Sequence, residues 1–291
     1  MITRFDHVVI GVRDLNAAAQ RYRQLGFDVR PGGRHTGLGT HNAIIRFGLD
    51  YIELISIYDE AEVRKSRLGR QVLIDFLRER EGGLLGYALA TTDIEQEAER
   101  FRGTELLVEE PFAMQRQRPD GRLLAWRLLI PGGYAWRRPW PFLIQWDAPD
   151  EQRLSWEEPG THPNGATRWT RATVVVRSLE SAIDLYQRQL GLALQDSGED
   201  SRLLARRATF SLGASSIDLL TPTGEGLAQQ VLTELGEGLL EVRFAVKDLH
   251  QARSFLHQSG ISFESDVAGP GTLLISPQHA LGARLILTKK D

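Results

Sequence analysis

Apolar and polar residues follow two different periods along the chain, and the change from one period to the other recurs. Residues 7–27 begin with an apolar run rich in Val and Ile, then show a short polar corner, an amphipathic pattern and a Leu-Gly stop. Residues 173–192 repeat this order. Val and Ile favour strands, whereas apolar residues three or four positions apart mark one face of a helix. Each stretch is therefore predicted to form a strand followed by a helix.

The residues at the predicted helix ends support this interpretation. Asp14 and Ser178 lie where the period changes, and their side chains can cap the first backbone amides of a helix. Gly26 follows the last periodic residues of the first copy, where glycine commonly ends a helix in a left-handed conformation. Both helices thus have a defined start, and the first has a defined end.

Two fainter copies follow the same order, in residues 87–101 with Asp93 as the cap and in residues 242–260 with Asp248. Sheet-like segments follow each copy, and they read NAIIRFGL, DYIELISI, ELLVEEPF, RLLAWRLLI, PFLIQWD, RLLARRATFSLG, SSIDLLTP, GTLLISP and ARLILTK. Internal repetition of this kind indicates a fold built from one supersecondary unit. The chain is predicted to be α+β, with four βαβββ modules in two pairs.

The two pairs are predicted to form tandem domains, at residues 1–148 and 166–291. Residues 149–165 are rich in Pro, Gly and acidic residues without periodicity, which is typical of a linker. Within the domains, Asp59 to Glu81 and Gly224 to Leu235 are predicted to be helices that join one module to the next.

Composition narrows the possible functions. With 42% apolar and 25% charged residues the chain is expected to be globular, and a net charge of -3 gives no reason to expect nucleic-acid binding. The absence of cysteine excludes disulfides, thiolate metal sites and cysteine nucleophiles. The first residues read as an alternating strand instead of a secretory signal, and no apolar run reaches the ~20 residues that span a bilayer. A cytoplasmic enzyme or binding protein, without a membrane partner, is expected.

The first sixty residues carry a family resemblance. The stretches FDHVVIGVRDL and DYIELI resemble the first and fourth strands of the vicinal oxygen chelate superfamily, which includes glyoxalase I, extradiol dioxygenases and bleomycin-resistance proteins. The block PGGRHTGLGTHNAIIRFGLDYIEL is similar to its glyoxalase-like subgroup. The resemblance implies that each pair of modules forms a curved, mostly antiparallel sheet around a cleft.

The resemblance also implies a divalent metal, held by a His on the first strand and a Glu on the fourth, that binds substrates through adjacent oxygens. His7 and Glu53 match these positions. Imidazole and carboxylate ligands suit Zn, Fe, Mn or Ni. In the second module the corresponding positions fall near Gly86, which cannot ligate, and at Ile144 or Gln145. The side-chain amide oxygen of Gln145 is a possible ligand there, but a weaker one than a carboxylate or an imidazole.

The second domain departs further from the pattern. Arg171 stands at the position of His7 and Asp218 at that of Glu53, while Glu241 and Ile286 occupy the positions of the last module. Arg171 with Asp218 or Glu241 is interpreted as an ion pair within a closed cleft. This domain is therefore expected to be a degenerate copy that supports the first domain or a dimer interface.

Further candidates surround the first cleft. Glu53 lies between apolar residues of a core strand, where an isolated carboxylate needs a metal, a cation or a proton-transfer role. His35 and His41 lie in a Gly-rich segment typical of a lid over a cleft, although surface histidines are an alternative. His41 is a candidate acid or base, and His35 a candidate substrate contact. Trp126, Arg127 and Trp146 are candidate pocket-wall residues, although strand tryptophans are as often simply core.

Three functions remain open on these residues. The first is a metal-assisted lyase, isomerase or dioxygenase acting on a small molecule, in which the metal stabilises an enediolate or binds vicinal oxygens while Glu53 or His41 moves a proton. His7 serves there as ligand or general base. The second is a metal-free protein of the resistance kind that sequesters a small molecule. The third is a degenerate scaffold that only forms a homodimer. Retention of both His7 and Glu53 in the first domain, beside loss of both in the second, favours a retained site in the first domain.

Overall fold

A computed structural model of the chain describes residues 1–35, 37–66, 71–107, 109–118 and 121–289. The first module consists of β1 (Ile2–Val12), α1 (Leu15–Gln24), β2 (Arg30–His35), β3 (Thr40–Arg46) and β4 (Tyr51–Ile57). The second consists of β5 (Gly82–Thr91), α4 (Ile94–Phe101), β6 (Phe112–Gln117), β7 (Leu123–Leu129) and β8 (Phe142–Trp146). Two short helices, α2 (Glu60–Lys65) and α3 (Gln71–Glu79), lie between them.

The second half of the chain repeats this order. Its third module consists of β9 (Ala166–Val175), α6 (Leu179–Asp184) with the π-helical turn η2 (Leu185–Gln189), β10 (Ala193–Asp200), β11 (Ala205–Leu212) and β12 (Ser215–Pro222). The fourth consists of β13 (Gly238–Val246), α8 (Leu249–Gln258), β14 (Phe263–Ser265), β15 (Thr272–Ile275) and β16 (Leu285–Lys289). The helix α7 (Leu227–Leu235) joins the two, and α5 (Asp150–Trp156) and the 3-10 turn η1 (Pro131–Gly133) complete the described helices.

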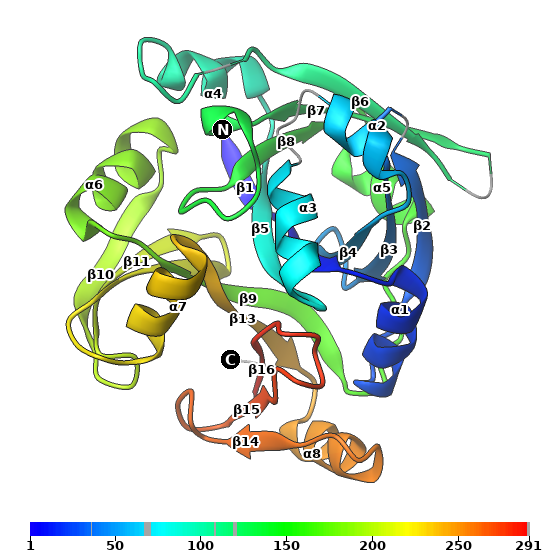
Figure 1. Cartoon of the computed structure of the whole chain (residues 1–291), viewed down its shortest axis with the longest axis vertical. Coiled ribbons are helices and arrows are strands. Elements are labelled where there is room, and N and C mark those ends of the chain that lie inside the picture. Colours follow the sequence, from blue (N-terminus) through cyan, green and yellow to red (C-terminus); the bar gives the residue numbers. More distant parts are fainter. Residues whose placement is uncertain (36, 67–70, 108, 119–120, 290–291) are drawn as a thin grey trace.

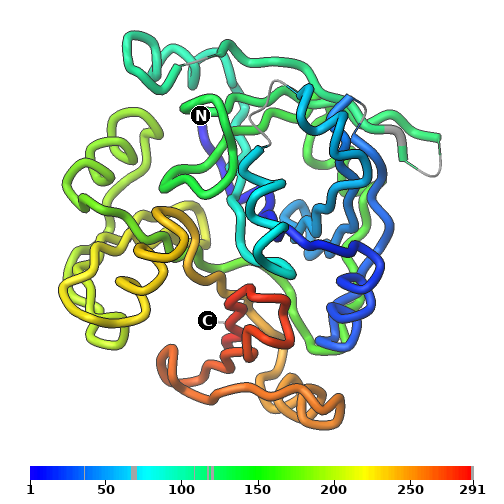
Figure 2. Tube along the Cα trace, in the orientation of Figure 1, coloured from blue at the N-terminus to red at the C-terminus, as the bar shows by residue number. Residues whose placement is uncertain are grey.

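The four modules form two eight-stranded sheets, which confirms the predicted α+β fold. The strand orders are β2-β3-β4-β1-β5-β8-β7-β6 and β10-β11-β12-β9-β13-β16-β15-β14. In the first sheet β1 pairs antiparallel with β5, whereas the β1–β4 and β5–β8 pairs are parallel. The second sheet has the same pattern. Figures 1 and 2 show each sheet as a curved ribbon, with the second sheet beside the first.

The two sheets share one hydrophobic core. Val8 and Ile10 of β1 belong to a core cluster that also contains residues of the second sheet, whereas Val9 faces the opposite side and joins a separate cluster. Phe5 stacks on Trp169 with ring centroids 3.9 Å apart. Successive strand residues point to opposite faces, so this packing leaves the other face of the first sheet to line its cleft. Helix α3 packs on that cleft side, and Figure 1 shows it over β1 and β5.

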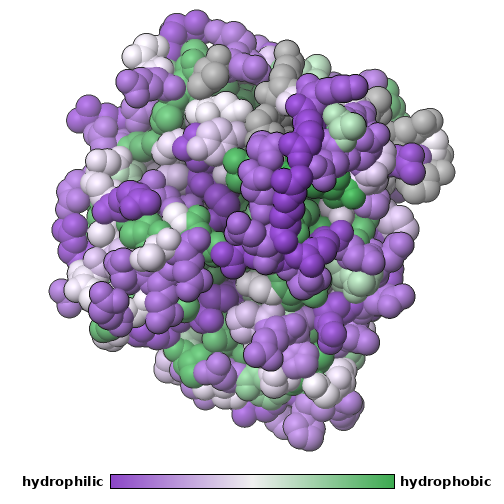
Figure 3. All heavy atoms as spheres, viewed as in Figure 1, coloured by the Kyte–Doolittle hydropathy of each residue, from purple (hydrophilic) through white to green (hydrophobic). Residues whose placement is uncertain are grey.

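The surface is mostly hydrophilic, as expected if most apolar residues are internal. On the face drawn in Figure 3, hydrophilic side chains cover most of the area and the hydrophobic ones are scattered among them. Every helix among the described residues is too short or too polar to cross a lipid bilayer.

Several predicted elements need correction. Strands β2 and β10 lie in segments for which no strand was expected, and ELLVEEPF, expected to be a strand, contributes only Phe112 to β6. The single helix expected over 59–81 is two helices, with residues 67–70 between them outside the described residues. The segment expected to be a linker contains α5, whose Arg153 is fully buried.

Candidate functional site

The cleft of the first sheet contains a cavity of ≈ 60 Å³ to which both modules contribute. One wall is polar and consists of His7, His35, Asn42, Glu53 and Arg116. The cavity is also lined by aromatic residues, which include Tyr51, Trp126, Trp136, Phe142 and Trp146. A small apolar pocket with a few convergent polar groups is the usual arrangement of a small-molecule site.

His7 is held with one ring nitrogen toward the cavity. Its Nδ1 lies 2.8 Å from Asp6 Oδ1, and its ring stacks on Tyr51 at 4.6 Å between centroids. Because an ionised carboxylate can only accept, His7 must donate its Nδ1 hydrogen to Asp6. In neutral His7 this leaves Nε2 with a lone pair, and Nε2 lies 3.8 Å from Glu53 Oε2.

Asp6 is fully buried and stays ionised because of its partners. Burial alone would raise its pKa, but the hydrogen bond from His7 and the charges of Arg4 and Arg153 hold the pKa well below its usual range. Arg4 lies 3.0 Å from Asp6 Oδ2, and the indole Nε1 of Trp146 donates to the same oxygen at 2.9 Å. Asp6 therefore fixes the orientation of two cavity residues.

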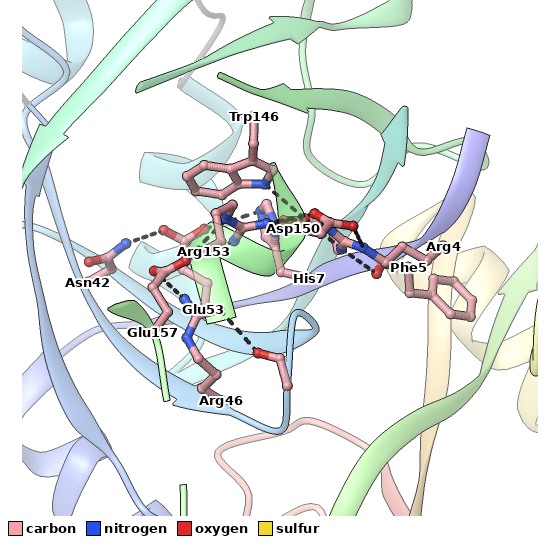
Figure 4. Close-up of polar contacts among 12 residues, drawn as sticks. Arg4, Phe5, His7, Asn42, Arg46, Glu53, Trp146, Asp150, Arg153 and Glu157 are labelled. Atoms are coloured by element: carbon pink, nitrogen blue, oxygen red, sulfur yellow. Dashed lines mark hydrogen bonds and ion pairs between the residues drawn. The ribbon is translucent and has the colours of Figure 1, made fainter. Parts of the chain in front are cut away.

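Helix α5 completes this buried network. The guanidinium of Arg153 lies 3.7 Å from the centre of the Trp146 ring, and its NH2 donates to Glu157 Oε2 at 2.9 Å. Glu157 in turn accepts from Arg46 at 2.7 Å. Figure 4 shows Arg153 beside Trp146, with Glu157 and Arg46 below them. The segment expected to be a linker thus supports the cavity wall.

Glu53 is a buried carboxylate with a lowered pKa. Burial opposes the shift, but the neighbouring His35 and His7, the hydrogen bond from Asn42 and the charge of Arg116 outweigh it. Asn42 Nδ2 donates to Glu53 Oε1 at 2.5 Å, the contact drawn in Figure 4. Glu53, for which the sequence identified no partner, is therefore ionised and hydrogen-bonded to Asn42 of the neighbouring strand β3.

His35 and Asn42 come from the β2–β3 hairpin. His35 Nδ1 lies 2.9 Å from Thr40 Oγ1, and its Nε2 lies 3.2 Å from Asn42 Nδ2. A Cβ on Gly32 would lie 1.9 Å from Asn42 Oδ1, so glycine is needed there for Asn42 to reach the cavity. The interpretation of this segment as a lid loop is wrong, because both histidines lie in paired strands.

Arg116 of β6 is a cavity residue that the sequence did not reveal. It is buried, and its NH1 lies 3.5 Å from Asn42 Oδ1. This contact is to an amide oxygen, and Glu53 is the carboxylate on which its charge acts. That charge lowers the pKa of Glu53, but the two groups are not within ion-pair distance, which leaves the guanidinium able to bind an anionic ligand. Arg116 was missed because a strand was expected at residues 105–112, whereas β6 begins at Phe112 and contains Arg116.

Three predicted site residues lie outside the cavity. His41 neighbours Asn42 on β3 but packs on Tyr58, and burial and the charge of Arg34 lower its pKa. Gln145 Oε1 accepts from Ile94 N at the start of α4. Arg127 pairs with Glu95 of α4.

These three predictions are corrected by strand alternation. Trp126 lines the cavity and its neighbour Arg127 points away from it, and the same alternation separates Trp146 from Gln145. His7, His35, Glu53, Trp126 and Trp146 are brought together, whereas Gln145, Arg127 and His41 are not.

Strand register also corrects the expected ligand position in the second module. Val9 pairs with Glu53 in the first module, and Ala88 pairs with Phe142 at the matching point of the second. The counterpart of Glu53 is therefore Phe142, two residues before the expected Ile144. At Gly86, the counterpart of His7, an added Cβ would meet the carbonyl oxygen of Ala135 at 2.6 Å, so only glycine fits.

The donor set of the cavity does not fit a divalent metal. No group of three or more His, Asp or Glu side chains suited to hold an ion occurs among the described residues. The amide nitrogen of Asn42 contacts both His35 Nε2 and Glu53 Oε1. These two atoms, which could otherwise coordinate a metal, are therefore engaged by a hydrogen-bond donor. The positive charge of Arg116 faces the same carboxylate, and Gly86 and Phe142 offer no ligand.

The second sheet has the ion pair expected from its sequence. Arg171 NH1 lies 3.2 Å from Asp218 Oδ2, and Glu241 pairs with Arg202 at 2.6 Å. The expected closed cleft is wrong, because a cavity of ≈ 550 Å³ opens beside Arg171.

Comparisons with known proteins agree with this architecture. A model of the family described as "Glyoxalase-like domain" matches residues 5–177. No curated protein matches the chain. A hypothetical protein from Staphylococcus aureus has a similar structure, with a TM-score of 0.70, 16% identity and coverage of 99% of this chain and 100% of that one.

Two enzymes also have similar structures. A mutant of 4-hydroxymandelate synthase from Streptomyces coelicolor gives a TM-score of 0.62 at 13% identity, covering 100% of this chain and 94% of that one. Methylmalonyl-CoA epimerase from Mycobacterium tuberculosis gives 0.41 at 21% identity, covering 45% and 93%. At these identities the likenesses to the Staphylococcus aureus protein and to 4-hydroxymandelate synthase bear on the fold alone, and the likeness to the epimerase supports no inference.

Proposed function

Because the chain belongs to the glyoxalase-like domain family, within the vicinal oxygen chelate superfamily, we propose that the cavity at His7 and Glu53 is an active site. The proposed reaction is a proton transfer on a small anionic substrate, as in an isomerase or a lyase. The observation that supports it most is the pair formed by His7 Nε2 and Glu53 Oε2, which face one another 3.8 Å apart in the cavity.

His7 is the proposed base. Its Nδ1 is anchored by Asp6, so Nε2 can accept a proton without the ring turning. The contact between Nε2 and Glu53 is too long for a direct hydrogen bond, which leaves His7 free to act on a bound molecule. The ionised carboxylate of Glu53 then stabilises the imidazolium that forms.

Arg116 and Asn42 are the proposed binding groups for the anionic part of the substrate. A guanidinium binds a carboxylate through charge-assisted hydrogen bonds, and these strengthen when water is excluded. Arg116 also lines a second cavity of ≈ 230 Å³, whose other charged residues are Arg30, Arg46, Arg118, Glu157 and Glu158. A substrate larger than the small inner cavity can extend into this neighbouring space.

In the proposed step, His7 Nε2 takes a proton from the carbon next to a substrate carbonyl. The electrons of that C–H bond form a C=C bond, and the carbonyl electrons move to oxygen, where Arg116 stabilises the negative charge. Return of the proton from His7 to a neighbouring atom gives an isomer. Loss of a leaving group from the adjacent carbon gives a lyase product instead, and His7 releases the proton to solvent.

The proposal is tested by solvent exchange, which needs no knowledge of the product. Small carboxylic acids with a carbonyl or hydroxyl group on the next carbon are incubated with the protein in D₂O, and loss of the C–H signal is followed by proton NMR. We expect exchange with the wild type, and a loss of at least ~100-fold in His7→Gln, since a positioned base contributes about that much. Arg116→Gln should weaken substrate binding.

The matched control is Arg188→Gln, which removes an exposed arginine that pairs with Asp184 and does not line the cavity. It should leave exchange unchanged. Exchange that persists in both His7→Gln and Glu53→Gln would refute the assignment of this cavity as the active site.

A metal-free binding protein is the second candidate, and the aromatic lining supports it. Trp126 and Trp146 lie 5.1 Å apart between ring centroids and can hold a planar ligand. Binding of a small molecule that is lost in Trp146→Ala, together with no exchange for any carboxylic acid, would favour this alternative.

A divalent metal at this site is the competing prediction, which rests on the family resemblance alone. Relatives in this superfamily typically use such ions, and His7 and Glu53 match two of the expected positions. The cavity as described does not complete a ligand set, so no step above depends on one. A dioxygenase reaction would require that metal, so it is predicted only together with it. Formation of a homodimer is a separate prediction.

A further inference from the structure

The cleft of the second sheet is lined for an anion. Its cavity of ≈ 550 Å³ has three arginines at its wall, Arg168, Arg171 and Arg243. The hydroxyl-bearing residues around them are Thr170, Ser211, Ser215, Ser216, Thr272 and Thr288. The described residues that line this cavity include no aspartate or glutamate. We propose that it binds a compact dianion, such as inorganic phosphate, a phosphate monoester or a short dicarboxylate.

The charges behind the cavity wall do not balance. Glu241 is shared by three guanidinium groups, since Arg202 lies at 2.6 Å, Arg243 at 3.7 Å and Arg284 at 3.8 Å. Asp218 pairs with Arg171. Of the three arginines in the cavity wall, Arg171 pairs with Asp218 and Arg243 shares Glu241 with two others, so the lining carries a net positive charge.

Burial makes this excess costly without a ligand. The side chains of Arg243 and Arg284 are only 17% and 18% exposed. Among the described residues, the Nε of each has no hydrogen-bond partner. Burial lowers the pKa of Arg243, and the adjacent Arg171 and Arg202 lower it further, despite the opposing charges of Glu241 and Asp218. An anion in the cavity would offset the repulsion at Arg243, whereas Arg284 lines a different cavity.

Two of the arginines are already held in place. Arg171 Nε donates to Ser216 Oγ at 3.0 Å, and Arg168 NH1 donates to the carbonyl oxygen of Ala214 at 2.8 Å. Guanidinium groups that are oriented before binding lose less entropy when an anion arrives, and they suit oxyanions with several acceptor atoms. This site shares no lining residue with the first cavity, so the inference does not depend on the proposed reaction.

Isothermal titration calorimetry of the full chain tests the inference, with sodium phosphate in one arm and sodium malonate in the other at constant ionic strength. Arg116→Gln serves as the background, so that binding at the first cavity does not contribute. We expect one site per chain for phosphate, malonate or both, and the two arms distinguish a tetrahedral from a planar ligand. Arg243→Gln added to this background should weaken binding about 10-fold or more, the effect of losing a charge-assisted bond.

Arg171→Gln is the second variant, in case Arg243→Gln does not fold, and circular dichroism checks both. Arg188→Gln, an exposed arginine of the same domain, is the control and should bind as the background does. The inference is overturned if neither ion binds, if Arg116→Gln alone abolishes binding, or if binding survives unchanged in both cavity variants.

Discussion

Replacing Asp6 with Asn removes the negative charge at the centre of the buried network and keeps the size of the side chain. Asp6 is fully buried and accepts hydrogen bonds from Arg4 and Trp146 as well as from His7. Arg153 is also fully buried and lies 3.7 Å from Asp6; without that charge it would keep Glu157 at 2.9 Å and the half-exposed Asp150 at 3.9 Å.

The structure sets the size of the effect. Breaking a buried ion pair by removing one partner costs about 3–5 kcal/mol, because the remaining charge is left without compensation. Asp6 interacts with two arginines, but Arg4 is partly exposed and also pairs with Asp150. We therefore expect Asp6→Asn to lower the free energy of unfolding by about 3–5 kcal/mol and not by twice that amount.

Urea unfolding at pH 7, followed by circular dichroism and tryptophan fluorescence, measures this loss. The control is Asp184→Asn, which breaks an exposed pair with Arg188 and should cost no more than about 0.5 kcal/mol. If Asp6→Asn costs no more than the control, the buried network does not hold the site as described.

The same substitution should change the tautomer of His7. The amide group of Asn can donate to Nδ1, which would place the ring hydrogen on Nε2 and remove the lone pair that faces Glu53. Nitrogen-15 NMR of His7 reports this directly. We expect an Nδ1–H tautomer in the wild type, and an Nε2–H tautomer in the wild type would contradict the role given to Asp6.

Four further predictions follow from the same contacts. Asp6 has a folded pKa below its unfolded value, so it stabilises the fold above about pH 4 and this stability is lost as the pH falls further. Urea midpoints should therefore fall more steeply below pH 4 in the wild type than in Asp6→Asn. Asn42→Leu removes the hydrogen bond to Glu53 and should raise the pKa of Glu53, measured by carbon-13 NMR of its carboxyl group. Gly32→Ala must displace Asn42, and should cost about 1–3 kcal/mol in urea unfolding. Gln145→Ala removes the bond to the start of α4 and should cost about 0.5–2 kcal/mol while leaving solvent exchange unchanged.

The fold could be predicted because its signals are local and repeated. The change of period and the capping residues Asp14, Asp93, Ser178 and Asp248 each mark the start of a helix, and all four cap a helix in the structure. Strand β10 was missed because its residues are exposed and polar, so they lack the alternation that a half-buried strand shows.

The site could be predicted only in part. His7 and Glu53 follow from their places in recognisable strands, but Arg116 and Asp6 acquire their roles from contacts with residues far away in the sequence. The counterpart of Glu53 was misplaced because register depends on the pairing of β5 with β8, which the pattern of apolar residues does not fix. Helix α5 was missed because its segment lacks an apolar stripe and buries the charged Arg153.

The central claim is that His7 and Glu53 act on the substrate themselves and not through a bound ion. Metal content of tag-free protein, measured by mass spectrometry for the wild type beside His7→Ala and Glu53→Ala, tests it most directly. We predict only traces of Zn, Fe, Mn and Ni in all three proteins, including after incubation with each ion. Near-stoichiometric metal in the wild type, lost in both variants, would contradict the claim and assign these residues as ligands.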